Sequence, residues 1–176
     1  MTRSRASVTA RAPWGAVKKR DDMQLSEFID FDSIRHDLSV SNKRALLNQL
    51  AQIAGQRLNI DSGRIADAIA DRERMGSTGF GGGVAIPHGK MDGLERIYGL
   101  AVRLAEPIGY KAIDGAPVDL IFLLLSPPDA GAEHLKALAT VSRLVRHAPT
   151  LEKLRGARTR DALAAVLLGS EERDAA

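Results

Sequence analysis

Histidines are the side chains of this sequence best suited to covalent or acid–base chemistry near neutral pH, because imidazole titrates near ~6.5. The chain contains four of them: His36, His88, His134 and His147. His88 stands between Pro87 and Gly89, in a turn-rich segment where packing does not require an imidazole. This context predicts a reactive histidine at position 88.

The stretch 72–90 around His88 is rich in residues that form turns. Five glycines precede the apolar tract 84–86: Gly76, Gly79, Gly81, Gly82 and Gly83. Glycine permits φ > 0 and lets the backbone come close to a ligand. The apolar tract 84–86 then predicts a short buried strand, which Pro87 ends because proline cannot donate a ladder hydrogen bond. His88 is therefore expected at the end of a strand.

His134 is predicted to belong to the same site. It falls in the first turn of an expected helix, directly after the loop 127–131. Like His88, it follows the C-terminal end of an apolar strand, and open α/β sheets place their sites at that edge. His147 lies near a helix C-terminus, where the dipole favours a cation, and is predicted to be a cap. His36 is predicted to lie on the surface or at a sheet edge.

Several other kinds of site lack their sequence signatures. The chain has no cysteine, which excludes disulfides, thiol catalysis and thiolate metal sites. The acidic residues near the histidines do not have a metal-ligand spacing such as His-Glu-x-x-His. The nucleophile elbow Gly-x-Ser-x-Gly and the P-loop are both absent. The run 79–83 lacks the third glycine of the dinucleotide fingerprint and precedes a strand, so it gives little support for nucleotide binding.

Phosphoryl transfer on a histidine fits the stretch better. A neutral imidazole is a nucleophile at neutral pH. A phosphoryl group on it needs hydroxyl and backbone N–H donors and one or two cations for its oxygens. These groups could come from the glycine backbone and from Arg72, Ser77, Thr78 and His134. A loose transfer positioned in this way requires no metal.

Hydrophobic periodicity predicts helices and strands that alternate in blocks. Helices are expected at 41–58, 61–73, 132–147, 150–154 and 159–168, with Ser41 and Thr159 as caps. The third helix is expected to turn inward Leu135, Leu138, Ala139, Val141, Leu144 and Val145. Strands are expected at 34–38, 84–86, 97–104 and 118–125. The last strand is apolar nearly throughout and is expected to be central, so the predicted fold is α/β, with a mixed central β-sheet sandwiched between α-helices in three layers.

The composition indicates a single folded domain with a short basic tail. The chain has 176 residues, and 44% of them are hydrophobic, which suffices for one core. Residues 1–22 carry six Lys/Arg and two Asp, whereas the rest carries 19 basic and 20 acidic residues. We expect a disordered tail at 1–22, a folded domain at 23–170 and a C-terminal tail at 171–176. The first tail lacks the apolar segment of a secretory signal, and Met23 is an alternative start.

These features limit the expected partners and location. The folded domain is nearly neutral, so binding to nucleic acid or to a membrane surface would depend on the basic tail alone. The longest apolar run, 120–125, is far shorter than the roughly 18 residues of a membrane span. We therefore expect a soluble, cytoplasmic protein that binds no nucleic acid and does not insert into a membrane.

The sequence 76–90, Gly-Ser-Thr-Gly-Phe-Gly-x-Gly-Val-Ala-Ile-Pro-His-Gly-Lys, resembles the active-site signature of the IIA proteins of the bacterial phosphotransferase system (PTS). Within these proteins it is most similar to the nitrogen-regulatory type, EIIA-Ntr, of the mannitol/fructose superfamily. Arg72 lies 16 residues before His88, and His134 lies 46 residues after it. The family's phosphate-stabilising arginine and second histidine have the same spacings. The resemblance covers residues 23–170 as one type 2 IIA domain.

The resemblance implies a role for each candidate residue. His88 would accept a phosphoryl group on Nε2 from the phosphohistidine of an HPr-like carrier (NPr). His134 would hydrogen-bond the phosphoryl oxygens, and Arg72 would neutralise their charge. The phosphate-binding residues would be completed by Ser77, Thr78 and Gly89. The family needs no cofactor and no metal for this step.

The resemblance also leaves alternative functions open. The first is a regulatory phosphocarrier that reports nitrogen, carbon or potassium status to targets such as sensor kinases or potassium transporters. The second is the IIA component of a fructose- or mannitol-type permease, which passes phosphate to a IIB domain. A binding module without chemistry is disfavoured because Arg72, His88 and His134 are all present. The motifs Gly-Ser-Thr-Gly and Pro-His-Gly-Lys favour the regulatory type. In either case an apolar rim around the site would dock the partners, and it is expected to comprise Phe80, Ile86, Met91 and Leu135.

Overall fold

The computed structural model describes residues 22–175, so the predicted tail 1–22 lies outside the described residues except for Asp22. Two short 3-10 helices open this part of the chain, η1 (Leu25–Glu27) and η2 (Phe31–Ser33). The α-helices are α1 (Lys43–Leu58), α2 (Ser62–Arg74), α3 (Gly131–Arg146), α4 (Ala148–Gly156) and α5 (Arg160–Ala175). The strands are β1 (Arg35–Leu38), β2 (Gly79–Gly81), β3 (Val84–Ala85), β4 (His88–Lys90), β5 (Tyr98–Ile108) and β6 (Val118–Ser126).

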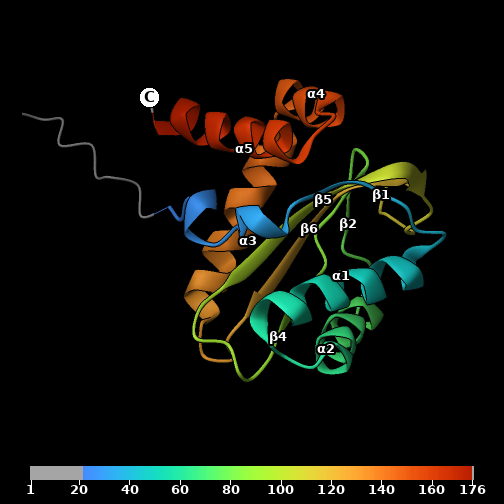
Figure 1. The fold of residues 1–176 in the computed structure, drawn as a ribbon, viewed down its shortest axis with the longest axis vertical. Coiled ribbons are helices and arrows are strands. Elements are labelled where there is room, and N and C mark those ends of the chain that lie inside the picture. The colour runs from blue at the N-terminus through green and yellow to red at the C-terminus, as the bar shows by residue number, and fades with distance from the viewer. Residues whose placement is uncertain (1–21, 176) are drawn as a thin grey trace, which may run out of the picture.

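The strands form one mixed sheet in the order β1-β5-β6-β3-β2, and β4 also pairs with β6 (Figure 1). β5 and β6 are antiparallel. β3 and β4 are both parallel to β6, with Val84 opposite Leu120 and His88 opposite Leu124. β6 is therefore the central strand, as its apolar sequence predicts. Its pairing with β4 places His88 near the C-terminal end of this strand.

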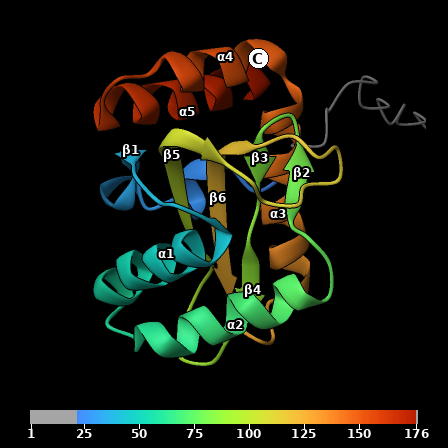
Figure 2. The same cartoon turned by 90° about the vertical axis from the view of Figure 1, so that its right-hand side faces the viewer.

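Alternate side chains of β6 enter two separate hydrophobic clusters, because successive residues of a strand point to opposite faces. Ile121 and Leu123 pack with buried residues of α1 and α2 on one face. Phe122 and Leu124 pack with buried residues of α3, α4 and α5 on the other face. Figure 2 shows the sheet between these two layers of helices. The predicted three-layer arrangement is confirmed.

Side chains that accept otherwise unpaired backbone N–H groups cap the start of α1, α2, α4 and α5, whereas α3 has no side-chain cap. Asn42 accepts such a bond at 2.8 Å and caps α1, so the prediction of Ser41 as the cap is wrong by one residue. Either residue type is a good cap, and only the backbone path decides between neighbours. Asp61 caps α2, and Thr159 accepts at 3.0 Å in the first turn of α5, as predicted.

The glycine-rich stretch contains more strand than the sequence predicts. β2, β3 and β4 replace the single strand expected at 84–86, and His88 begins β4 instead of following a strand end. The prediction fails at Pro87, which lacks an N–H but whose carbonyl accepts from Leu124 N at 3.0 Å. Pairing with β6 therefore resumes at the next residue. Gly82 and Gly83, with φ of 64° and 81°, lie in the turn between β2 and β3.

The inner face of α3 contains Leu138, Val141, Leu144 and Val145 as predicted, but two of the six predicted positions point away from the core. Leu135 is 67% exposed, and Ala139 is exposed as well, so their assignment to the inner face is wrong. The buried positions are His134, Ala137, Val141, Leu144 and Val145. Their spacing of three and four residues defines one helix face, which carries the imidazole toward the sheet. A polar residue on the inner face cannot be recognised from apolar periodicity.

Several elements are longer than predicted. α4 covers Ala148–Gly156 in place of the expected 150–154. β5 continues from the expected end at residue 104 to Ile108, with an irregular register after Arg103. α5 continues to Ala175, so the predicted C-terminal tail at 171–176 is helical as far as the structure describes it. Across residues 22–175, no helix has the length and apolar character needed to cross a membrane.

Candidate functional site

His88 is held at the start of β4 in a defined tautomer. Its Nδ1 lies 2.8 Å from the carbonyl oxygen of Ile86. Because a carbonyl oxygen can only accept, Nδ1 carries the proton. Arg72 Nε donates to His88 Nε2 at 3.1 Å, so Nε2 carries the lone pair. The two contacts together place the proton of this half-buried ring on Nδ1 and its lone pair on Nε2.

Arg72 approaches His88 from the last turn of α2. Besides the bond to His88, its Nη1 donates to the carbonyl oxygen of Gly76 at 3.0 Å. Two hydrogen bonds from a planar group fix the orientation of the guanidinium. Negative charge placed on His88 Nε2 would therefore meet a cation that is already in position.

His134 lies beside His88 although 46 residues separate them in sequence. The ring centroids are 5.3 Å apart, and the rings are tilted by 51°. His134 is only 6% exposed, and its Nδ1 bonds to the hydroxyl of Ser126 at the end of β6. With Nδ1 engaged, the ring would contact a neighbouring anion through Nε2.

Both imidazoles are neutral at pH 7. Burial lowers the pKa of His88 below its ordinary value of 6.5, and the nearby charge of Arg72 acts in the same direction against the hydrogen bond to Ile86. Burial also lowers the pKa of His134 to about 4, with smaller contributions from His88 and Lys90. Two neutral rings lie side by side without repulsion, and Nε2 of His88 keeps its lone pair.

The low pKa of His134 predicts a specific loss of stability in acid. Below pH 6.5 the unfolded chain binds a proton at this ring that the folded protein does not bind until about pH 4. The unfolding free energy should therefore fall as the pH drops through this window, by about 3 kcal/mol for this group. Urea unfolding of wild-type protein and His134→Gln at several pH values measures the difference. Equal acid losses in the two proteins would contradict it.

The hydroxyls of Ser77 and Thr78 form hydrogen bonds within the loop after α2. Ser77 Oγ accepts from Gly79 N at 3.1 Å. Thr78 is buried, and its Oγ1 donates to Glu73 Oε2 at 2.5 Å. In the structure the two side chains thus fix the shape of the turn that leads into β2.

Gly89 allows α2 to lie close to β4. A Cβ at this position would be 3.2 Å from the backbone carbonyl carbon and oxygen of Ala68 on α2, which is tighter than ordinary van der Waals contact. The missing side chain therefore brings the helix that carries Arg72 onto the strand that carries His88. Its role in the geometry is close backbone approach.

The structure brings Arg72, His88 and His134 together and adds residues that sequence reasoning did not select. Ser126 ends the apolar strand and holds His134. Glu73 is next to Arg72 in sequence and accepts hydrogen bonds from Thr78. It also forms an ion pair with Lys43, the first residue of α1. The position of Glu73 beside Arg72 was the available signal, but its partners come from segments far apart in sequence.

The predicted apolar rim differs from the observed surface. Ile86 and Met91 are 4% and 7% exposed, so their assignment to the rim is wrong. Both side chains are buried in the core: Met91 belongs to the hydrophobic cluster on one face of the sheet and Ile86 to the cluster on the other. Leu135 is exposed, and Phe80 is partly buried. Two further apolar side chains are exposed in segments that adjoin the glycine-rich loop: Met75 and Ile113.

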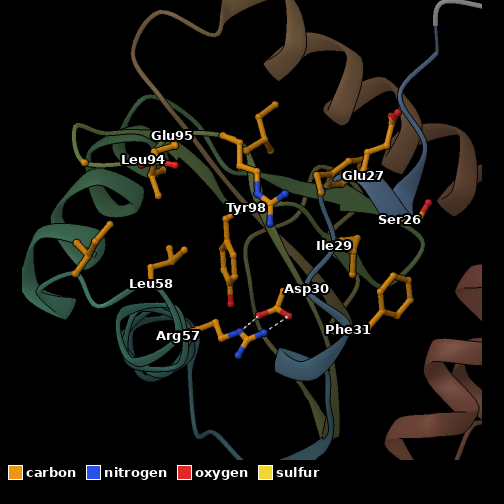
Figure 3. A pocket seen from close by; sticks show the side chains of 15 residues that line it. Ser26, Glu27, Ile29, Asp30, Phe31, Arg57, Leu58, Leu94, Glu95 and Tyr98 are labelled. Carbon is orange, nitrogen blue, oxygen red and sulfur yellow. Dashed lines mark hydrogen bonds and ion pairs between the residues drawn. The ribbon is translucent and has the colours of Figure 1, made fainter.

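A cavity of about 570 Å³ lies elsewhere, among η1, the end of α1 and the segment before β5 (Figure 3). Its lining includes Asp30, Arg57 and Tyr98, but not Arg72, His88 or His134. Arg57 Nε donates to Asp30 at 2.6 Å, and Tyr98 donates to Ser33 at 2.9 Å. Because none of the three site residues lines it, the cavity is separate from the histidine site.

Comparisons with known proteins assign the chain to a family. The family model for the phosphoenolpyruvate-dependent sugar phosphotransferase system, EIIA 2, matches residues 27–169. A nitrogen regulatory protein of Bradyrhizobium diazoefficiens is 42% identical over 145 residues, which is 82% of this chain and 95% of the relative.

Solved structures extend the comparison to the fold. The nitrogen regulatory protein IIA-Ntr of Neisseria meningitidis superposes with a TM-score of 0.77 at 32% identity, over 81% of this chain and 98% of that one. The IIA mannitol protein of Escherichia coli gives 0.67 at 14% identity, over 78% and 97%, and so shows a shared fold. The chain with its paired histidines and arginine therefore belongs to the EIIA type 2 family of the phosphoenolpyruvate-dependent phosphotransferase system.

Proposed function

We propose that this protein is a regulatory phosphocarrier that accepts a phosphoryl group on Nε2 of His88 from the phosphohistidine of an HPr-like carrier. The observation that carries the proposal is the tautomer of His88. Nδ1–H donates to the carbonyl oxygen of Ile86, and Arg72 Nε donates to Nε2, which therefore has the lone pair. A nucleophile oriented in this way needs no proton removal before it attacks.

The step balances without a cofactor. The bond between phosphorus and the carrier's imidazole nitrogen breaks, and that nitrogen keeps the electron pair. The hydrogen bond from Arg72 Nε to His88 Nε2 breaks, and a new bond forms between phosphorus and that nitrogen, while Nδ1 keeps its proton and its hydrogen bond to Ile86. The charge on the phosphoryl oxygens is stabilised by Arg72 and by the neighbouring His134.

The remaining candidate residues act in this proposal by shaping the site. Ser77 and Thr78 hold the loop that follows α2, and Gly89 keeps α2 against β4. Arg72 and His88 lie on these two elements, so their separation depends on the contact.

We propose a regulatory role ahead of a sugar-specific one. The chain is 42% identical to a nitrogen regulatory protein over 82% of its length, whereas its identity to fructose-type EIIA components is lower, at 35% and 36%, and covers 62% and 73% of its length. Its phosphorylation state would then be read by target proteins, such as sensor kinases or potassium transporters, because phosphorylation adds about two negative charges at the site. Since phosphoenolpyruvate is made and used in the cytoplasm, we place the protein there. The alternative is a fructose- or mannitol-type IIA protein that passes phosphate to a IIB domain.

The direct test reconstitutes the carrier chain from purified enzyme I, the HPr-like carrier and labelled phosphoenolpyruvate. We expect label on this protein that is lost in acid, survives alkali and maps to the peptide containing His88. Added IIB domains of fructose and mannitol permeases should not draw the label off at a catalytic rate. Fast transfer to one of them would favour the sugar-specific alternative, and an unlabelled wild-type protein would refute the proposal.

Leu135 provides a test of partner docking. It is 67% exposed and adjacent to His134, so a carrier that reaches His88 should cover it. Leu135→Asp should raise the KM for the phosphorylated carrier about tenfold, or about 1.4 kcal/mol, with a smaller effect on kcat. Leu168→Asp on α5, at a position 43% exposed, is the matched control and should behave as wild type. Unchanged KM in the Leu135 variant would place docking elsewhere.

A further inference from the structure

Glu73 is a buried carboxylate at the centre of a hydrogen-bond network that adjoins the histidine site. Its side chain is 7% exposed. Thr78 donates to it twice, from N at 2.9 Å and from Oγ1 at 2.5 Å, and Lys43 Nζ lies 2.5 Å from Oε1. Tyr110 donates from its hydroxyl at 3.5 Å. The carboxylate thus ties together the start of α1, the end of α2, the glycine-rich loop and the segment after β5.

This network continues to the reactive ring through two backbone groups. The carbonyl of Thr78 accepts from Ile86 N at 2.9 Å. The carbonyl of Ile86 then accepts from His88 Nδ1 at 2.8 Å. The position of the carbonyl that selects the tautomer of His88 is therefore fixed, through Thr78, by the carboxylate of Glu73.

The same residue also controls the other side of the ring. Glu73 follows Arg72 directly on the last turn of α2, and Arg72 Nε donates to His88 Nε2. Holding Glu73 in place therefore holds the backbone from which Arg72 reaches His88. Both nitrogens of the imidazole are oriented by groups that Glu73 anchors.

The charge of Glu73 is maintained by its partners. Burial raises the pKa of this carboxyl, but the hydrogen bonds and the charge from Lys43, with those from Thr78, outweigh burial and bring the pKa below its ordinary value. The ammonium of Lys43 also lies 4.4 Å from the centre of the Tyr110 ring. An ionised carboxylate accepts only, so it cannot be replaced by a neutral amide without breaking one of these bonds.

We propose that Glu73 is a positioning residue for phosphoryl transfer, which keeps His88 in the tautomer with the proton on Nδ1 and the lone pair on Nε2. The inference rests on the proposed function of His88. It differs from a purely structural role for Glu73, which would affect folding but leave the tautomer and the transfer step of the folded protein unchanged.

The test uses Glu73→Gln, with Glu152→Gln on an exposed position of α4 as the matched control. Imidazole nitrogen NMR above neutral pH reads the tautomer, and steady-state transfer from the phosphorylated carrier reads kcat and KM. For Glu73→Gln we expect both tautomers of His88 and a fall in kcat of about tenfold, with KM unchanged. The wild-type protein and Glu152→Gln should show one tautomer and the same kcat.

A second variant keeps the proposal testable if Glu73→Gln does not fold. Thr78→Val removes the hydroxyl donor but retains the backbone N–H bond to Glu73, and it should produce a smaller shift in the same two measurements. A folded variant with the wild-type tautomer and wild-type kcat would overturn the proposal. So would a fall in activity that matches the fraction unfolded while the tautomer stays unchanged. Failure of the proposed function appears separately, as wild-type protein that takes no label on His88.

Discussion

His88→Gln is expected to lose phosphoryl acceptance, with a fall in the transfer rate of at least about a thousandfold. Glutamine places an amide near the position of the ring and can still donate to the carbonyl of Ile86, which His88 contacts at 2.8 Å. An amide nitrogen has no lone pair available for attack on phosphorus, so the nucleophile is lost while polarity is kept. Transfer of label from the phosphorylated carrier, followed by gel and scintillation counting, measures the effect.

The control for this variant is another histidine. His36 is exposed on the edge strand β1, so His36→Gln should accept phosphate at the wild-type rate. Thermal unfolding of both variants shows whether either change disturbs the fold. If His88→Gln still accepts phosphate on a histidine, the acceptor is a different ring, and His134 would be the first to be examined because its centroid lies 5.3 Å away.

Arg72→Lys is expected to slow transfer about a hundredfold, or about 2.7 kcal/mol in the barrier, even though the positive charge is kept. Arginine donates from Nε to His88 and from Nη1 to Gly76 at the same time. A lysine ammonium is a single point donor on a flexible stem and cannot maintain both contacts. The effect should fall on kcat, because the charge that develops on the phosphoryl oxygens is stabilised during transfer.

An arginine-to-lysine change far from the site is the control, because it shows what this substitution does when the arginine has no part in transfer. Arg160→Lys lies at the exposed start of α5 and should leave kcat and KM at their wild-type values. Single-turnover transfer from the phosphorylated carrier gives the rate of the chemical step directly. A wild-type rate for Arg72→Lys would mean that charge alone suffices and that the hydrogen bond to His88 has no role in transfer.

The elements that sequence reasoning located well are those with strong local signals. The helices α1 and α2 have a repeating apolar face and clear caps, and β6 is a continuous apolar run between turn residues. The predictions that failed are of two kinds: those in which two neighbouring residues are equally good helix caps, and those that depend on pairing between strands far apart in sequence. Asn42 in place of Ser41 is of the first kind, and β4 after Pro87 is of the second.

The candidate site shows the same division. The composition of the stretch 72–90 by itself indicates a reactive His88 with a nearby arginine, because glycine, proline and hydroxyl residues are concentrated there. The distance of 5.3 Å between His88 and His134 depends on β4 pairing with β6 and on α3 turning its polar residue inward. Periodicity assigns apolar residues to the core and polar residues to the surface. It therefore placed Leu135 in the core, where it does not lie, and could not place His134 there.

What the sequence alone determined is the set of reactive groups, the order of most helices and strands and the resemblance to IIA proteins, since each depends on residue type and spacing along the chain. The resemblance implies Nε2 as the acceptor nitrogen of His88, but only the tertiary structure shows why the lone pair lies on that nitrogen. That outcome depends on the carbonyl of Ile86 on one side of the ring and on Arg72 on the other. Hydrogen bonds act over about 3 Å, and only the folded chain brings these groups within that distance.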